Sequence, residues 1–300
     1  MVLESKGKVA ENLYAIGNAA LPAFLWQGTI PALFDAGMTF MGPIYFRDLG
    51  NHLGDAQKLR YLFITHSHFD HCGSAPYLKR KIPAMKIGAS SKAADVWNRP
   101  NAIQMIQNLS KGAEESSKMQ IGDESVLFDR LEVDIPLEDG SEIDLDNEAK
   151  VRVIATPGHT RDAVSFYLPW IKTLICGEAV GTLNRDRSVR PQFLANDQDY
   201  LDSLSKLRGL NIAVLIMAHL NILTGDDVQK HISRSIEATV AFRQRIEKEL
   251  AAAHGDTQAA VEKIFQEDFR EKKIILQEER PYRINLTAQV KTIAGVRSSK

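Results

Sequence analysis

The segment that most constrains this chain is FITHSHFDHCG, residues 63–73, which gathers three of the chain's eight histidines. It follows an apolar run, Tyr61 to Ile64, that predicts a buried strand. Alternate side chains of an extended segment share a face, so His66 and His68 can point at one ion. If a helix begins just beyond, Asp70 and His71 turn toward a neighbouring position. This spacing indicates metal binding, and the donors suit Zn²⁺, Fe or Mn.

Four residues do not fill two metal sites, so further ligands must come from elsewhere in the chain. His159 lies in IATPGHT, Glu178 in LICGEA and His219 in IAVLIMAH. Each follows an apolar, strand-like run, and strand ends gather along one edge of a sheet. We therefore expect these three to complete the site. The other histidines, His52, His231 and His254, lack this context, and we assign them structural or solvent roles.

Composition places the chain among ordinary globular proteins and disfavours several partners. The 300 residues are 44% hydrophobic and 25% charged, with a formal net charge of -1. No basic cluster interleaved with aromatics favours a nucleic acid or an anionic membrane. The first residues lack the apolar core of a secretory signal, and no run approaches the roughly 18 apolar residues of a membrane span. We expect a cytoplasmic protein.

Cys72 and Cys176 are too few for a disulfide framework and are expected to be buried.

The chain shows two parts, with an insertion in the first. Short strands with turns at glycine alternate with helices up to residue 224. Residues 90–122 predict helices broken near Pro100, with an apolar stripe at Ile103, Met105, Ile106 and Leu109 that either packs on the core or lines a substrate pocket. Residues 225–300 predict a helical extension packed on or near the active site. Its long first helix carries Val228, Ile232, Ile236, Val240 and Leu250, and later helices open near Thr257 and Asn285.

The motif THSHFDH, followed in order by PGHT, CGEA and AH, resembles the signature of the metallo-β-lactamase superfamily. The resemblance covers about residues 9–224, and the tail is similar to the extension of the quinolone-signal response thioesterase and related hydrolases. It implies an α/β fold, the four-layer αββα sandwich, with a catalytic domain at 1–224 and the helical extension at 225–300.

The resemblance also implies a ligand set. His66, His68 and His159 would hold a first metal, and Asp70, His71 and His219 a second. The bridging carboxylate falls on Glu178, where the family ordinarily has aspartate, and Leu220 follows His219 where glycine is common. Glutamate has one more methylene, so it could bridge after a shift, bind one ion only or leave the second ion weak. Asp35, in ALFDAG, resembles a carboxylate that fixes a ligand histidine, and a turn residue is an equal alternative.

These residues lead us to expect a metal-dependent hydrolase with two divalent ions, Zn²⁺ before Fe or Mn. A hydroxide shared by the ions would attack an acyl thioester, ester or lactone, acyl-CoA among them, with Asp70 orienting it. The alternatives are a phosphodiesterase or nuclease, an iron-dependent oxidoreductase and a regulatory effector with a vestigial site. We expect a small-molecule substrate, no nucleic acid and no membrane, and the sequence leaves open whether the chain forms a homodimer.

Overall fold

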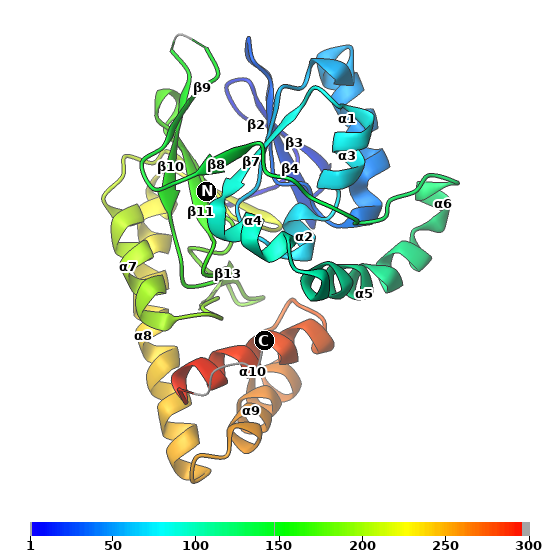
Figure 1. The fold of residues 1–300 in the computed structure, drawn as a ribbon. Helices are drawn as coiled ribbons and strands as arrows, with labels where there is room; N and C mark the ends of the chain where they lie inside the picture. The colour runs from blue at the N-terminus through cyan, green and yellow to red at the C-terminus, as the bar shows by residue number, and fades with distance from the viewer. Residues whose placement is uncertain (1, 147, 296–300) are drawn as a thin grey trace. The chain divides into compact units, whose positions relative to one another are not determined.

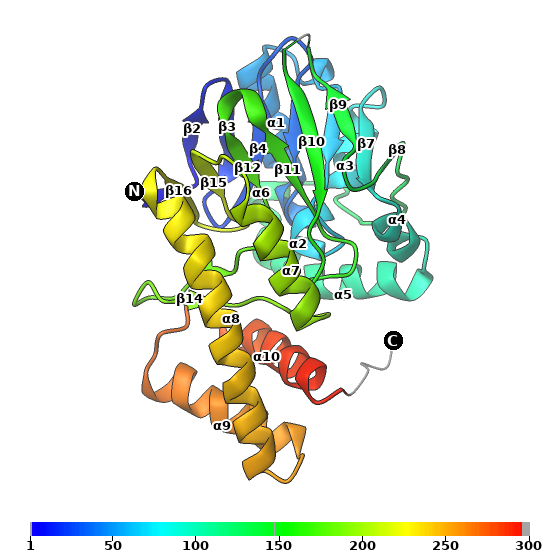
Figure 2. The same cartoon turned by 90° about the vertical axis from the view of Figure 1, so that its left-hand side faces the viewer.

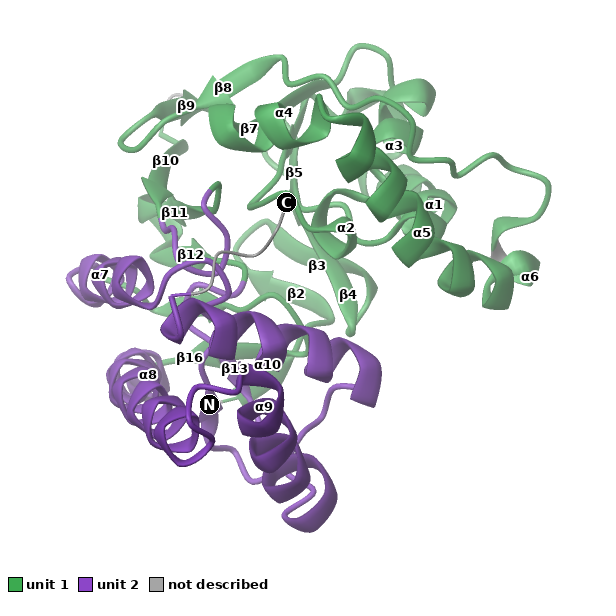
Figure 3. Cartoon of the chain, turned by 60° about the horizontal axis from the view of Figure 1, so that its bottom comes forward, with its two compact units in different colours: residues 1–155, 162–177, 211–225 green, residues 156–161, 178–210, 226–300 purple. Residues whose placement is uncertain are grey.

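The computed structural model describes residues 2–146 and 148–295. The chain divides into two compact units, coloured green and purple in Figure 3. Unit 1 comprises residues 1–155, 162–177 and 211–225, and unit 2 comprises residues 156–161, 178–210 and 226–300. The predicted domain boundary after residue 224 does not coincide with the division into these two units, and it stays a prediction. Residues 296–300, the end of the predicted extension, lie outside the described residues.

In the described part of the chain, two seven-stranded sheets form the centre of unit 1. The first has the spatial order of the chain itself, and its strands are β2 (Gly7–Ala10), β3 (Leu13–Asn18), β4 (Leu21–Trp26), β5 (Ala32–Phe34), β6 (Tyr61–Phe63), β7 (Lys86–Ser90) and β8 (Ile135–Leu137). Strands β2 to β5 pair antiparallel, whereas β5 to β8 pair parallel. The parallel half is thus the one that leads into the histidine motif after β6.

The second sheet has the order β1-β16-β15-β12-β11-β10-β9. Its strands are β1 (Val2–Glu4), β9 (Glu142–Asp144), β10 (Lys150–Ala155), β11 (Val164–Leu168), β12 (Thr173–Ile175), β15 (Val214–Ile216) and β16 (Asn221–Thr224). All neighbours pair antiparallel except β12 and β15, which are parallel. Both sheets are therefore mixed.

The two sheets pack face to face because their strands alternate between two apolar faces. Phe34 and Phe63 point toward the second sheet, where Phe166 of β11 lies with ring centroids 5.3 and 5.7 Å from theirs. Their neighbours Leu33 and Leu62 point to the opposite face. This period of two is the strand signature, and it makes the first sheet the middle of a layered sandwich.

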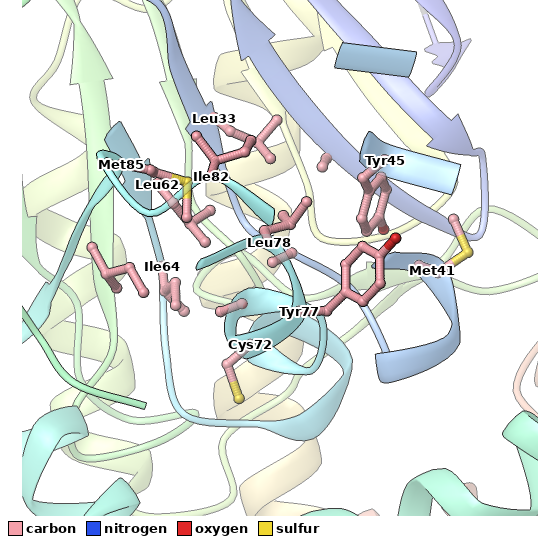
Figure 4. Close-up of a cluster of buried hydrophobic side chains, with 14 of the residues drawn as sticks. Leu33, Met41, Tyr45, Leu62, Ile64, Cys72, Tyr77, Leu78, Ile82 and Met85 are labelled. Carbon is pink, nitrogen blue, oxygen red and sulfur yellow. The ribbon is translucent and has the colours of Figure 1, made fainter. Parts of the chain in front are cut away.

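Helices cover the outer face of the first sheet. The helical segments of unit 1 are η1 (Thr39–Met41), α1 (Gly42–Leu53), η2 (Ala56–Lys58), α2 (Phe69–Cys72), α3 (Ala75–Lys81), α4 (Ser91–Trp97), α5 (Pro100–Ser116), α6 (Lys118–Ile121) and η3 (Pro169–Ile171). Tyr45 of α1 and Tyr77 and Leu78 of α3 pack with Leu33 and Leu62, as Figure 4 shows. The predicted α/β sandwich followed by C-terminal helices is confirmed (Figure 1).

Unit 2 is a short hairpin with a group of helices. Its elements are β13 (Thr182–Leu183), β14 (Val189–Arg190), α7 (Asp197–Arg208), α8 (Asp226–Ala252), α9 (Thr257–Phe265), a π-helix (Gln266–Glu271) and α10 (Glu279–Ile293). Helix α8 contacts α7, α9 and α10, and Figure 2 shows α7 beside it. Phe269 stacks on both Phe265 and Tyr282, with ring centroids 4.9 and 5.9 Å apart. Within the described range, no helix is both long and apolar enough to cross a membrane.

Three helical predictions need correction. In α5 only Ile106 of the predicted stripe is buried, whereas Met105 is 63% exposed, because adjacent positions on a helix point about 100° apart. In α8 the predicted positions Val228 and Ile232 are buried. The buried face also includes His231, Ser235 and Thr239, whereas the predicted Val240 is exposed. Helix α10 begins at Glu279, six residues before Asn285, because Pro281 falls in the first turn, where its missing N–H breaks no helical hydrogen bond.

Candidate metal centre

The histidine motif lies in a loop and a short helix that follow β6. His66 and His68 belong to the loop, and His68 is extended, with φ -68° and ψ 147°, just before α2. Asp70 and His71 lie inside α2, so the change from loop to helix turns them away from the first pair. The predicted helix start just beyond His68 is thus observed, and the segment presents its donors in two directions.

The remaining predicted ligands lie in loops, a few residues beyond the strands. His159 follows β10, Glu178 follows β12 and His219 follows β15. Each follows its apolar strand, as expected, but after a gap of a few loop residues, since the strands end at Ala155, Ile175 and Ile216. The loops supply turns that strands cannot, as at Gly158, whose φ is +127° and where a Cβ would collide with the backbone of Tyr200.

The structure brings all seven predicted ligands into two groups. His66, His68 and His159 form the first group, and Asp70, His71, Glu178 and His219 form the second. Within each group, one candidate ligand atom per residue lies within 4.8 Å of the others. Most of these side chains are buried, with exposed fractions of 1% for His66, 2% for His71, 4% for His159 and 7% for Glu178. The groups have the composition that a divalent ion requires.

Hydrogen bonds at Nδ1 fix the orientation of several imidazoles. His159 Nδ1 lies 2.6 Å from the carbonyl oxygen of Gln192, and His219 Nδ1 lies 2.7 Å from that of Ala20. A carbonyl oxygen only accepts, so each Nδ1 carries the proton and each Nε2 keeps its lone pair. His71 Nδ1 lies 2.8 Å from the carboxylate of Asp35 with the same consequence. These rings therefore offer Nε2 as the ligand atom, and the donors fit a bound metal.

Asp35 is the carboxylate that the sequence singled out without deciding its role. It is 5% exposed, its φ is 62°, and it accepts hydrogen bonds from Thr65 N at 2.8 Å and from His71. Thr65 Oγ1 lies 3.0 Å both from Asp35 and from Nδ1 of His66. The Thr65 hydroxyl donates its hydrogen to Asp35, so its oxygen accepts a hydrogen bond from Nδ1 of His66. With the proton on Nδ1, Nε2 of His66 keeps its lone pair for an ion. The reading of Asp35 as a residue that fixes ligand histidines is supported.

Sequence reasoning missed several supporting residues. Asp162, 6% exposed, accepts from Ser67 N at 2.7 Å and from Ser67 Oγ at 3.1 Å, and so holds the loop between His66 and His68. Its position just after PGHT was the available signal. No sequence signal marks the backbone carbonyl groups of Gln192 and Ala20, because every residue has a backbone carbonyl.

His231 and Ser235 support the loop that follows Glu178. His231 Nε2 and Ser235 Oγ both donate to the carbonyl oxygen of Val180, each at 2.9 Å. His231 is 4% exposed, and burial lowers its pKa to about 4. A neutral His231 is therefore a structural residue.

The two departures from the family pattern have different structural settings. Glu178 Oε2 lies 3.7 Å from Nε2 of His159, and Asp70 Oδ2 lies 3.5 Å from Nε2 of His219. Glu178 thus belongs to the second group and also approaches a histidine of the first. Leu220 has a φ of +61°, a left-handed conformation that favours glycine, and this chain adopts it with a leucine.

The two cysteines and two of the tryptophans pack in the core. Cys72 and Cys176 are both buried, as expected, and burial raises the pKa of the Cys72 thiol well above its usual value. Trp26 is 5% exposed and Trp97 is 1% exposed, which fits core packing.

A profile of the metallo-beta-lactamase superfamily matches residues 22–219. The chain therefore belongs to the metallo-beta-lactamase superfamily and is a hydrolase of that superfamily. It is similar to the probable metallo-hydrolase YflN of Bacillus subtilis (strain 168), with 25% identity over 227 residues that cover 67% of this chain and 79% of that protein. A beta-lactamase-like protein 2 homolog from Caenorhabditis elegans is 25% identical over 198 residues, 64% of this chain and 52% of that protein.

Solved structures show the same fold at low identity. A metallo-beta-lactamase family protein from Thermus thermophilus superposes with a TM-score of 0.64 at 20% identity, covering 96% of this chain and 92% of that one. The subclass B3 metallo-beta-lactamase BJP-1 of Bradyrhizobium japonicum gives a TM-score of 0.58 at 17% identity, covering 83% and 97%. The predicted family and fold are confirmed, whereas the likeness to the quinolone-signal response thioesterase stays a prediction.

Proposed function

We propose that this chain is a metal-dependent hydrolase of acyl thioesters, esters or lactones. The observation that carries the proposal is the pair of donor groups assembled from His66 to His219. Superfamily membership supports hydrolysis, and the net charge of -1 favours a small substrate over a nucleic acid.

In this proposal His66, His68 and His159 hold one ion, and Asp70, His71 and His219 hold another. Divalent ions held there, Zn²⁺ by preference, would polarise an acyl carbonyl and supply a water that loses its proton near neutral pH. Glu178 would bridge the two positions. Its 3.7 Å approach to His159 supports this role, since the same carboxylate belongs to the second group.

The chain's own residues would order the reaction through their fixed orientations. Asp35 and the carbonyl groups of Gln192 and Ala20 hold the Nδ1 protons of His71, His159 and His219. The Asp70 carboxylate is partly exposed, at 22%, and so is open to solvent at its position beside His219. Asp70 would accept the proton of the attacking water and return it to the leaving group.

A substrate panel with a ligand variant tests the proposal. An acyl-CoA thioester, an N-acyl homoserine lactone and bis(4-nitrophenyl) phosphate would be offered to the wild type and to His68→Ala. We expect cleavage of the thioester or the lactone, with a loss of at least about 100-fold in kcat/KM in the variant. His52→Ala is the matched control, because His52 lies in α1 against Tyr14, outside both donor groups. Activity that survives His68→Ala, or cleavage of the phosphodiester alone, would refute the proposal.

A further inference from the structure

Arg190, the last residue of β14, is a largely enclosed cation in unit 2. Its Nη1 donates to Oε1 of Gln277 at 3.0 Å, and its Nη2 lies 3.4 Å from Oγ1 of Thr182. The guanidinium carbon lies 5.4 Å from the ring centroid of Tyr282. Among the described residues, its buried Nε has no hydrogen-bond partner. Only two of the five guanidinium N–H groups therefore have a partner in the described part of the chain.

Within residues 2–146 and 148–295, the partners of Arg190 are all neutral. Burial raises the pKa of the Tyr282 phenol well above its usual value, so this ring carries no charge at neutral pH. Burial also lowers the pKa of Arg190, the mark of a cation removed from water. Arg245 of the same unit differs, because it pairs with Glu267 and Asp268 at 2.7 Å. A buried charge without a counter-ion is costly, and a bound anion removes that cost.

Arg190 is connected to the candidate metal ligands through the hairpin. Thr182, its cross-strand partner, follows Glu178 after one turn, closed by a hydrogen bond from Gly181 N to Glu178 O of 3.0 Å. Thr182 Oγ1 also accepts from Nε2 of Gln192 at 3.0 Å, and the Gln192 carbonyl holds His159. The same short segment thus carries the cation and supports ligands of both groups.

We propose that Arg190 binds an anionic group of the substrate, a carboxylate or a phosphate monoester. The planar guanidinium suits both groups, since each presents paired oxygens to its N–H groups. The residue as a whole is only partly buried, whereas its Nε is fully buried. This inference rests on the proposed function and narrows its substrates to acyl compounds that carry a negative charge away from the bond that is cleaved.

Three thioesters that differ in charge test the proposal. S-acetyl-N-acetylcysteamine is neutral, S-succinyl-N-acetylcysteamine carries a carboxylate, and S-acetyl-4′-phosphopantetheine carries a phosphate. In Arg190→Met we expect KM to rise about 10- to 100-fold for one of the anionic substrates, with the neutral substrate unchanged. The substrate that is affected shows whether the anion is a carboxylate or a phosphate. An equal loss on all three substrates, or no change on any, overturns the proposal.

Two further variants separate charge recognition from folding. Arg190→Lys keeps the positive charge but loses the planar guanidinium, so it should retain part of the preference for the anionic thioester over the neutral one. If Arg190→Met does not fold, the lysine variant provides the test. Arg185→Met is the matched control, because Arg185 lies in the same hairpin, is exposed and donates to the backbone of Ile275 at 3.2 Å. We expect it to behave as the wild type, and an equal effect in this control overturns the proposal.

A binding measurement makes the test independent of hydrolysis. Calorimetric titration of the holoprotein with succinate and with inorganic phosphate should show that one of them binds the wild type at least about 10-fold more tightly than Arg190→Met. Any binding of the anion to the metal ions is the same in the wild type and in Arg190→Met. It therefore does not contribute to the difference in affinity between the two proteins. If no thioester is cleaved but this difference is found, the proposed reaction fails and the anion site stands. Equal binding to both proteins overturns the site.

Discussion

The carboxylate of Asp35 shows how much of a metal centre depends on a residue that need not touch the metal. It contacts His71 directly, and through Thr65 Oγ1 it is connected to His66. These two histidines belong to different donor groups. The left-handed φ of 62° at Asp35 is a conformation that aspartate tolerates better than most residues. One buried carboxylate therefore orients ligands in both groups.

Asp35→Asn should weaken metal binding. The amide replaces one acceptor oxygen with an N–H donor. Either the N–H of His71 Nδ1 or the N–H and hydroxyl groups of Thr65 therefore lose their hydrogen-bond acceptor. We expect a loss of about 10- to 100-fold in zinc affinity, measured by competition with a chelator. Asp48→Asn is the control, because Asp48 accepts from Gly17 N at 3.0 Å and belongs to neither donor group. Equal zinc affinity in Asp35→Asn and the wild type would show that Asp35 stabilises the local turn and does not orient the candidate ligands.

At the scale of elements, helix α8 is unusual in the polarity of its buried face. His231, Ser235 and Thr239 are all buried, and the first two donate to the carbonyl oxygen of Val180. Val180 lies two residues beyond Glu178, so the helix fixes the loop that carries this ligand. A polar face with specific hydrogen bonds defines the loop position more closely than apolar contacts would.

His231 predicts a pH dependence of stability. Its pKa is about 4 in the folded protein and about 6.5 when unfolded, so the unfolded chain binds more protons between these values. The contribution to stability is complete above pH 6.5 and is lost as the pH falls toward 4, a change of about 3 kcal/mol. Urea unfolding between pH 4 and 7 should show this dependence in the wild type and a weaker one in His231→Gln. Parallel curves for the two proteins would contradict it.

The sequence predicted elements whose pattern is local and missed those set by packing. The strands at β3, β4 and β6 were visible as apolar runs, and α9 as a helix that opens near Thr257. The apolar part of the buried face of α8, at Val228 and Ile232, was visible in the sequence. Its polar part was not, because hydrophobicity alone continues the face to Ile236 and Val240. Two of these polar residues, His231 and Ser235, form hydrogen bonds with the carbonyl oxygen of Val180, a contact between distant parts of the sequence.

At the scale of the whole molecule, the candidate centre gathers loops that lie far apart in the chain. The candidate ligands could be singled out from the sequence, because His66 to His71 form a dense motif and the later candidates follow apolar strands. Their distances and the anchors at Nδ1 could not be predicted, because they depend on tertiary structure. Bound ions would therefore join distant segments and stabilise the folded chain by mass action. The number of ions rests on Glu178, which belongs to the second group and approaches His159 of the first.

The most direct test of this account is the number of metal ions per chain, measured by elemental analysis of the purified protein after equilibration with zinc and removal of free metal. The two donor groups predict two ions per chain. One ion per chain would contradict the two-ion site, and a chain that retains no ion would contradict the assignment of a metal-dependent hydrolase altogether.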